Sequence, residues 1–332
     1  MKSLNTTNYK FLTRKTGGFR MNIIEVKNVS KKFDDKIVLD NISFTVEEGD
    51  IFGLIGPNGA GKSTLINIMT GLLDANNGKV TIGGYDIKKE TLKAKEFFGL
   101  VPQELALIET VSAYDNLEFF GSLYGLKGKL LKEKISYALD VTGLNEKKKE
   151  KVKKFSGGMK RRLNLAAAIM HQPKILILDE PTVGIDPHSR NHIFEFIKGI
   201  NRDHNTTVIY TSHYMEEVEY LCNNLFIIDE GKEIAYGSKK NVKSMISNNN
   251  KVNLKIENIT NELIDKIKSI DGVIDCENSH DEIKLLVEDY NFKLEPLLKI
   301  LENNHSTIRS INVEEPNLEE VFLALTGKKL RD

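Results

Sequence analysis

The chain has few cysteines and no apolar run long enough to cross a membrane. Its 332 residues contain two cysteines, Cys222 and Cys276, which lie far apart and form no ligand pattern. This excludes a disulfide framework and a cysteine metal site, and it predicts two reduced thiols in a cytosolic protein. A transmembrane helix needs about 20 consecutive apolar residues, and no such run occurs. If the protein works at a membrane, we expect another protein to provide the span.

The chain also lacks an excess of charge of either sign. Its 47 Lys and Arg residues balance 47 Asp and Glu residues, so the formal net charge is +0. The composition therefore does not indicate nucleic acid as the main partner. Hydrophobic residues make up 40% of the chain and charged residues 28%, which is typical of a soluble protein with a sizeable core. The length allows about two domains.

Residues 1–20 lack acidic side chains and an apolar segment. The missing apolar segment excludes a secretory signal, and with little to bury the segment is not expected to fold. Three interpretations stay open: a start assigned too far upstream, since Met21 opens the first patterned segment, a basic arm on anionic lipid, or a transit peptide. We expect a disordered extension or an incorrectly assigned start. The basic residues are Lys2, Lys10, Arg14, Lys15 and Arg20.

The strongest local motif is a glycine-rich loop at residues 56–63. It follows the apolar run Ile51 to Ile55, which is typical of a buried parallel strand, and precedes a helix expected over Thr64 to Thr70. The loop matches G-x-x-x-x-G-K-[ST] in the strand-to-helix context that this pattern needs. Glycines let the backbone wrap around phosphates, while loop N–H groups and the helix N-terminus face the anion. Lys62 adds a charge near the terminal phosphates, and Ser63 offers a hydroxyl to Mg²⁺. The expected nucleotide-binding residues are Gly56, Pro57, Asn58, Gly59, Ala60, Gly61, Lys62, Ser63 and Thr64.

A second apolar strand, expected over residues 174–178, ends in Asp179 and Glu180. Ligands bind outside the carboxyl ends of strands in open α/β sheets, so this position favours a catalytic role over a surface turn. Asp179 is expected to hold Mg²⁺ through water or through Ser63, and Glu180 to orient and deprotonate the attacking water. His213 follows the strand expected over residues 207–211 and is predicted to contact a γ-phosphate from the same edge. No role is assigned to His171, His188, His192, His204, His280 and His305.

Other segments surround these motifs. A β-hairpin is expected from Ile23 to Val46, with its turn at residues 34–35 and with Ile24, Val26 and Asn28 on one face of its first strand. Phe33 at this turn either stacks on a nucleotide base or packs against the protein. Residues from about 104 to 170 form a predicted helical insert with a lysine-rich, solvated surface at 146–154. Ser156 is expected to cap a helix that continues to His171, where it marks either a second anion site or a simple cap.

The last third of the sequence predicts a separate small domain. Residues 238–250 are polar and rich in asparagine, so we place a linker at 241–250. Expected strands and helices then follow in the order β-α-β-β-α-β, which is a ferredoxin-like pattern. A short amphipathic helix from about residue 317 ends this domain. No catalytic group is evident in it, and we interpret the domain as regulatory or dimer-stabilising.

Over residues 22 to 240, the motifs together resemble those of the ATP-binding cassette (ABC) ATPases. The signature departs from the family at Phe155, where leucine is usual, and at Met159, where glutamine is usual. That variant, with Lys160-Arg161-Arg162 and Pro181 to Gly184 after it, resembles the drug, antibiotic and lipid exporter branch. The matching elements are Phe33 (adenine-stacking aromatic), Gly56 to Ser63 (Walker A), Gln103 (Q-loop), Ser156-Gly157-Gly158 (signature), Lys174 to Asp179 with Glu180 (Walker B and catalytic glutamate), Asp186 (D-loop) and His213 (switch).

The resemblance implies an α/β fold, namely a P-loop NTPase domain of the ABC ATPase type over residues 21–240. This domain would contain a RecA-like core, an antiparallel β subdomain and the helical subdomain at about 104–170. A small α+β ferredoxin-like domain would follow over 251–316, with a C-terminal helix and tail over 317–332. It further implies an ATPase that binds ATP and Mg²⁺ in a head-to-tail dimer. Lys62, Ser63, Gln103, Asp179, Glu180 and His213 of one subunit would face each γ-phosphate, with Ser63, Gln103 and Asp179 also serving Mg²⁺. Ser156, Gly157 and Gly158 of the other subunit would close over it.

The partner implied is a separate ABC-2 type transmembrane permease, with this chain peripheral on the cytoplasmic face of the membrane as a homodimer. Its cargo would be a drug, an antibiotic, a lipid or a similar substrate, and the sequence does not specify which. A non-transport ABC ATPase acting on ribosomes or nucleic acid is one alternative, but one cassette without a heptad run disfavours it. The other is a regulatory subunit that holds nucleotide without turnover, which the intact Glu180 and His213 disfavour.

Overall fold

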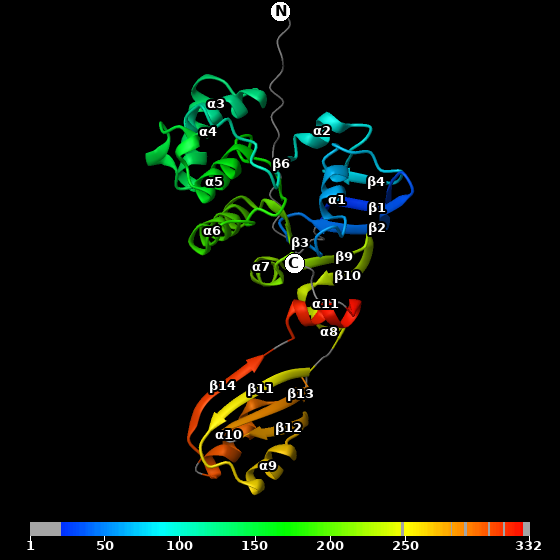
Figure 1. Ribbon diagram of the computed structural model, residues 1–332, viewed down its shortest axis with the longest axis vertical. Coiled ribbons are helices and arrows are strands. Elements are labelled where there is room, and N and C mark those ends of the chain that lie inside the picture. Colours follow the sequence, from blue (N-terminus) through cyan, green and yellow to red (C-terminus); the bar gives the residue numbers. More distant parts are fainter. Residues whose placement is uncertain are drawn as a thin grey trace, which may run out of the picture.

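The chain folds into a larger body with two sheets and a smaller body with one sheet (Figure 1). We call the larger one, from Asn22 to Ser244, the upper body, and the smaller one, from Asn249 to Glu314, the lower body. The computed structural model describes residues 21–246, 249–279, 281–288, 291–304, 306–314 and 316–327. The expectations for residues 1–20, for the tail at 328–332, and for His280 and His305 lie outside the described residues.

The central sheet of the upper body has six strands in the order β10-β9-β3-β8-β7-β6. Pairing is parallel from β9 to β6, and β10 runs antiparallel to β9. Strands β3, β7 and β8 are buried along their whole length, which explains why β3 and β7 are apolar runs without alternation. The carboxyl ends of the parallel strands therefore meet at one edge of the sheet. The strands are β3 (Ile51–Ile55), β6 (Phe98–Val101), β7 (Ile175–Leu178), β8 (Thr207–Ser212), β9 (Asn224–Asp229) and β10 (Lys232–Ser238).

A second, antiparallel sheet has the order β2-β1-β4-β5, and its predicted hairpin is confirmed. The alternation predicted for its first strand is wrong beyond Val26. Asn28 has a left-handed backbone with φ of 51°, and the register of β1 shifts between Val26 and Val29. This bulge turns Val29 into the core and leaves Asn28 exposed. The strands are β1 (Asn22–Phe33), β2 (Lys36–Glu47), β4 (Asn77–Ile82) and β5 (Tyr85–Asp86).

Helices cover both faces of the central sheet. One face of the central sheet shares a core with α1 (Lys62–Met69), α2 (Thr91–Lys95) and the antiparallel sheet. The other face packs against α6 (Pro187–His204) and α7 (Met215–Leu221). Between β6 and β7 the chain forms the expected helical segment, which shares the core of the second face. Its elements are α3 (Ala113–Leu123), α4 (Gly128–Val141), the 3-10 helices η1 (Asn145–Lys147) and η2 (Val152–Lys154), and α5 (Gly157–Ala168).

Helix α5 ends at Ala168, three residues before the predicted end at His171. Gln172 adopts a left-handed backbone with φ of 54°, and Pro173 follows it. A residue before proline is disfavoured in the helical region, and a left-handed residue ends a helix, so the chain leaves the helix early.

The lower body has the predicted β-α-β-β-α-β order. Its strands pair antiparallel in the order β12-β13-β11-β14. Leu254 and Leu285 from the sheet pack with Leu263, Leu297 and their neighbours from the two helices in a core of its own. The elements are β11 (Asn249–Ile256), α9 (Asn261–Lys268), β12 (Val273–Ser279), β13 (Glu282–Glu288), α10 (Leu294–Asn303) and β14 (Ile308–Glu314).

The linker predicted at 241–250 is wrong at both of its ends. Helix α8 (Lys239–Ser244) occupies residues 241–244, and β11 begins at Asn249. The Ser238 hydroxyl caps α8 by accepting a hydrogen bond of 3.2 Å from the Asn241 N–H. Val242 is fully buried in the core of the upper body. This segment has the polar composition of a linker, yet it forms the short helix α8, because one N-cap and one buried apolar side chain stabilise it.

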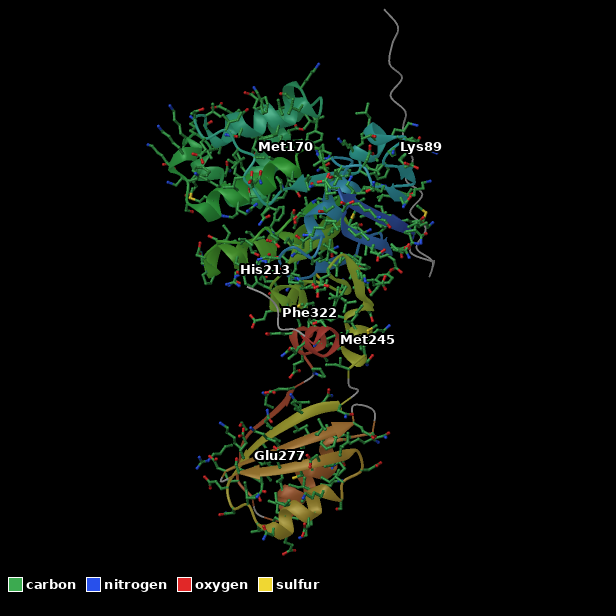
Figure 2. The ribbon with its side chains drawn as sticks, turned by 45° about the vertical axis from the view of Figure 1, so that its right-hand side comes forward. Lys89, Met170, His213, Met245, Glu277 and Phe322 are labelled. Carbon is green, nitrogen blue, oxygen red and sulfur yellow. The ribbon has the colours of Figure 1, made fainter. Side chains whose placement is uncertain are left out.

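The C-terminal helix α11 (Leu318–Thr326) does not complete the small domain as its position in the sequence suggests. It contacts α7 and α8, and Leu318, Val321 and Phe322 are buried in the core of the upper body. Figure 2 shows Phe322 at the junction of the two bodies. Lys251 of β11 forms an ion pair of 3.0 Å with Glu320 of α11, so this helix touches both bodies.

We expect Phe322→Ala to lower the free energy of unfolding by about 3–5 kcal/mol, because it leaves a cavity beneath a helix held by three apolar residues. Leu323→Ala is the matched control, since Leu323 lies on the same helix and is 40% exposed. Denaturant unfolding of both variants measures the difference. Equal losses would contradict the packing of α11 on the upper body.

Candidate active site

The phosphate-loop glycines occupy positions where a side chain would be strained or would clash. Gly61 has φ of 110°, and a Cβ on Gly56 would lie 2.2 Å from the carbonyl oxygen of Ile228 in β9. The loop thus packs against the central sheet and passes into α1 at Lys62. Gly56 is required by space, and Gly59 and Gly61, with φ of 81° and 110°, are required by conformation.

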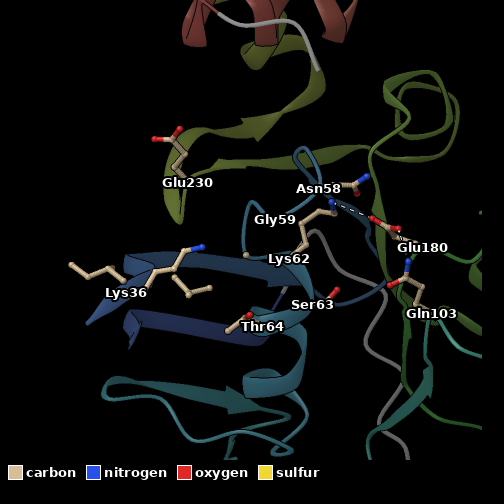
Figure 3. A pocket seen from close by; sticks show the side chains of 12 residues that line it. Lys36, Asn58, Gly59, Lys62, Ser63, Thr64, Gln103, Glu180 and Glu230 are labelled. Carbon is tan, nitrogen blue, oxygen red and sulfur yellow. Dashed lines mark hydrogen bonds and ion pairs between the residues drawn. The ribbon is translucent and has the colours of Figure 1, made fainter. Parts of the chain in front are cut away.

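The loop borders a cavity of about 770 Å³ at the carboxyl edge of the sheet (Figure 3). Most of the predicted loop residues line it, and Gln103 and Glu180 join them from β6 and β7. The far wall comes from β2 and from the β9–β10 turn. The lining residues are Lys36, Ile37, Val38, Asn58, Gly59, Gly61, Lys62, Ser63, Thr64, Gln103, Glu180 and Glu230.

Phe33 lies next to this wall, at the end of β1, where it pairs with Lys36 of β2. Its side chain is 46% exposed, and the ammonium of Lys31 lies 5.0 Å from the centre of its ring. The ring is outside the set of described residues that line the cavity.

Lys62 and Glu180 form a buried ion pair. The Lys62 Nζ lies 3.2 Å from Glu180 Oε1, and the two side chains are only 5% and 7% exposed. The same ammonium donates hydrogen bonds to the carbonyl oxygens of Gly56, at 2.8 Å, and Pro57, at 3.2 Å. A buried cation needs such partners, and here a carboxylate stands beside the lysine at the place where a phosphate is expected.

Two further predicted residues reach the same carboxylate. Gln103 donates a hydrogen bond of 3.1 Å from Nε2 to Glu180 Oε2, and Nδ1 of His213 lies 3.3 Å from Glu180 Oε1. Lys62, Gln103 and His213 follow three different strands, and Figure 3 shows Lys62 and Gln103 approaching Glu180 from different sides. The tertiary structure therefore brings three predicted residues together around the carboxylate of a fourth.

Asp179 and Glu180 are held by Thr211, which the sequence analysis did not single out. The Thr211 hydroxyl donates a hydrogen bond of 2.7 Å to Asp179 Oδ1 and accepts one of 2.8 Å from the Glu180 N–H. Glu180 has a left-handed backbone with φ of 45°, a strained conformation for a glutamate. A polar residue at the carboxyl end of a buried strand is the signal that could have revealed Thr211.

Arg161 of α5 fixes the backbone next to Gln103. Its guanidinium donates hydrogen bonds of 2.8 Å to the carbonyl of Pro102 and of 2.7 Å to that of Gln103. Burial lowers the pKa of Arg161, and the charge of Asp179 acts in the opposite direction. In the sequence this arginine stands only in a branch-specific run, Lys160-Arg161-Arg162, and that run does not predict its link to Gln103.

Ser156, Gly157 and Asp186 are exposed, and they lie outside the set of described residues that line the cavity. The Ser156 hydroxyl caps α5 by accepting a hydrogen bond of 3.2 Å from the Met159 N–H. Asp186 caps α6 by accepting one of 3.0 Å from the Ser189 N–H, and this bond lowers the pKa of Asp186. Gly158 packs against Ser189, where a Cβ would lie 2.2 Å from the hydroxyl oxygen. The starts of α5 and α6 are thus joined at the surface.

Family models match both parts of the chain. A model described as "ABC transporter" matches residues 39–183. A second model, described as "ATP-binding protein DrrA1-3-like, C-terminal domain", matches residues 237–326. The two matches together include most of the residues that line the cavity, the lower body and α11.

Curated proteins and solved structures agree with these models. The chain is 45% identical over 312 residues to the linearmycin resistance ATP-binding protein LnrL of Bacillus subtilis, covering 93% of this chain and 100% of that protein. It is 35% identical to the Nod factor export ATP-binding protein I of Sinorhizobium fredii, covering 93% and 87%. Its structure resembles that of cbiO1 from Clostridium perfringens, part of the ABC transporter complex cbiONQ. The TM-score is 0.62 at 29% sequence identity, covering 67% of this chain and 90% of that one.

Proposed function

Since the chain belongs to the ATP-binding proteins of ABC transporters, which are ATPases, we propose that it hydrolyses ATP to drive a separate permease that exports a drug, antibiotic, lipid or similar substrate. The observation that carries the catalytic part is the convergence of Lys62, Gln103 and His213 on Glu180 beside the phosphate loop. The match of residues 237–326 to a DrrA-like domain supports the exporter branch over an ATPase that acts on ribosomes or nucleic acid.

Each of these residues has a role that its position supports. Phosphoryl transfer depends mainly on positioning and on neutralising charge. Lys62 neutralises the terminal phosphates, and Glu180 accepts a proton from the attacking water. His213 and Gln103 orient that water and the γ-phosphate from the next strands. When ATP is bound, its γ-phosphate gives Lys62 a second anionic partner, which leaves Glu180 available to act as a base.

Ser63, Gln103 and Asp179 suit Mg²⁺, because their hydroxyl, amide and carboxylate oxygens are hard donors. Gln103 uses its Nε2 on Glu180, so its amide oxygen remains the group that suits a cation. The ion, when bound with the nucleotide, neutralises negative charge on the phosphates.

The exposed signature and D-loop suit a composite site in a head-to-tail dimer. Ser156, Gly157 and Gly158 at the start of α5 lie outside the cavity of their own chain, and the exposed Ser156 and Gly157 are accessible to the nucleotide of a second copy. Asp186 at the start of α6 lies beside them. Because one chain carries both halves of the site, a homodimer has two competent sites. ATP shared between the subunits stabilises the closed dimer, and hydrolysis lets it reopen.

We further propose that the permease is of the ABC-2 type and that this chain is peripheral on the cytoplasmic face of the membrane. Every helix in the described ranges is too short or too polar to cross a bilayer. The relatives named for linearmycin resistance and for Nod factor export act on different compounds, so they support a class of cargo rather than one molecule.

We expect tagged Glu180→Gln protein, solubilised from its own cell membranes in mild detergent with ATP, to bring down one polytopic membrane protein in stoichiometric amount. The variant is chosen because it retains the ATP-bound dimer. Glu216→Gln, at an exposed position, is the control for removing a carboxylate. Recovery with ribosomes or nucleic acid, and without a membrane protein, would contradict the transport function.

A further inference from the structure

A buried carboxylate outside the cavity joins three segments of the upper body. Glu217 lies on α7 and is only 3% exposed. Its Oε2 accepts hydrogen bonds from the hydroxyls of Thr182, at 2.8 Å, Tyr210, at 2.8 Å, and Ser212, at 3.0 Å. Its other oxygen, Oε1, lies 3.6 Å from Nη1 of Arg190 on α6.

Two of the hydroxyl donors lie close in sequence to the proposed active-site residues. Thr182 comes two residues after Glu180, and Ser212 comes directly before His213. Arg190 lies one turn into α6, whose first turn is capped by Asp186. One carboxylate is therefore bonded to the segment after the proposed base, to the segment that carries the switch histidine, and to the helix that follows the D-loop.

This network has little freedom to rearrange. A buried charge is costly unless it is paired and hydrogen-bonded, so loss of any partner is unfavourable. Tyr210 remains protonated and able to donate, since burial first and the charge of Glu217 next raise its pKa well above the usual value. The Thr182 and Tyr210 hydroxyl oxygens also lie 3.2 Å apart, so the two donors sit side by side on the same carboxylate oxygen. Fully satisfied buried networks hold their members in one arrangement.

We propose that Glu217 is a positioning residue for ATP hydrolysis. It holds the segments that carry Glu180 and His213 in fixed positions relative to each other and does not touch the nucleotide. The inference rests on the roles proposed above for those two residues. The polypeptide at Glu180 is strained, and the hydroxyl of Thr182 anchors it two residues later. The hydroxyl of Ser212 anchors the chain next to His213, so both groups are held relative to the same carboxylate.

Glu217→Gln keeps the size of the side chain and removes its charge. We expect kcat for ATP to fall by about tenfold while KM stays within about twofold, because positioning affects the reaction step more than ground-state binding. The matched control is Asp50→Asn. Asp50 is 2% exposed and accepts hydrogen bonds from Asn223, at 3.2 Å, and Asn224, at 2.7 Å, beside the opposite end of β3. Asp50→Asn should lower the melting temperature and leave kcat unchanged.

A second variant isolates one link of the network. Thr182→Val keeps the shape of the side chain and removes only its hydroxyl, so it should lower kcat in the same direction, and it carries the test if Glu217→Gln does not fold. Added to Glu217→Gln, it should lower kcat little further, because both changes break the same connection. A kcat at the wild-type level in Glu217→Gln, or a change in kcat equal to that of Asp50→Asn, would overturn the proposal. Full hydrolysis in His213→Ala would instead contradict the role proposed for His213, and absence of ATP hydrolysis in the wild type would contradict the proposed function itself.

Discussion

Replacing Glu180 with glutamine should lower ATP turnover by about 10²–10⁴-fold while ATP still binds. Glutamine cannot accept the proton of the attacking water, although it fills the same space. The change also removes the anionic partner 3.2 Å from the Lys62 ammonium, which leaves that cation to the phosphates. ATP affinity should therefore be equal to or higher than that of the wild type, in contrast to the loss of turnover.

Steady-state phosphate release and equilibrium binding of a fluorescent ATP analogue measure the two quantities separately. Glu216→Gln is the control, because Glu216 is an exposed carboxylate on α7, one residue before Glu217. Its turnover should equal that of the wild type. Normal turnover in Glu180→Gln would exclude Glu180 as the base. Loss of ATP binding would show that the carboxylate acts mainly by holding Lys62 and the phosphate loop in place.

Replacing Ser156 with arginine should abolish ATP hydrolysis and spare ATP binding. Ser156 is exposed at the start of α5 and lies outside the cavity of its own chain, so a long charged side chain there does not reach the nucleotide of the same subunit. In a head-to-tail dimer it would instead meet the nucleotide of the partner and inactivate the site that it enters. Loss of the cap alone would cost about 1 kcal/mol of stability, which is too little to unfold the chain.

Mixing two inactive variants tests the composite site directly. A heterodimer of Ser156→Arg and Lys62→Ala subunits has one site with both Lys62 and Ser156 intact and one site with neither. Random mixing of equal amounts should therefore restore about a quarter of wild-type turnover, since half of the dimers are mixed and each has one of two sites. Absence of recovery, with both variants folded and able to exchange subunits, would contradict the head-to-tail arrangement. Full activity of Ser156→Arg by itself would contradict it as well.

Features that depend on neighbouring residues were predictable from the sequence. The phosphate loop needs glycine at Gly61 because the backbone there has φ of 110°, and the pattern shows this glycine. The apolar runs of β3 and β7 are continuous because these strands are buried on both faces. The β-α-β-β-α-β order of the lower body also follows from local patterns.

Other features depend on which distant groups meet. Glu217 lies on the same face of α7 as the apolar Val218 and Leu221, and this helical pattern indicates that it faces inward. That spacing cannot tell which hydroxyls surround it, because Thr182 and Tyr210 come from separate segments. Arg161 and Thr211 were missed for the same reason, since each acts on a residue of another strand or loop.

The sequence by itself determined the order of the motifs, the strands that carry them and the chemistry of the side chains at their ends. Only the tertiary structure decided that Lys62, Gln103 and His213 converge on Glu180, and that α11 packs on the upper body rather than on the domain before it. The physical reason is that an amphipathic pattern shows that a face must be buried. The surface that buries it is chosen by long-range packing and by the pairing of buried charges.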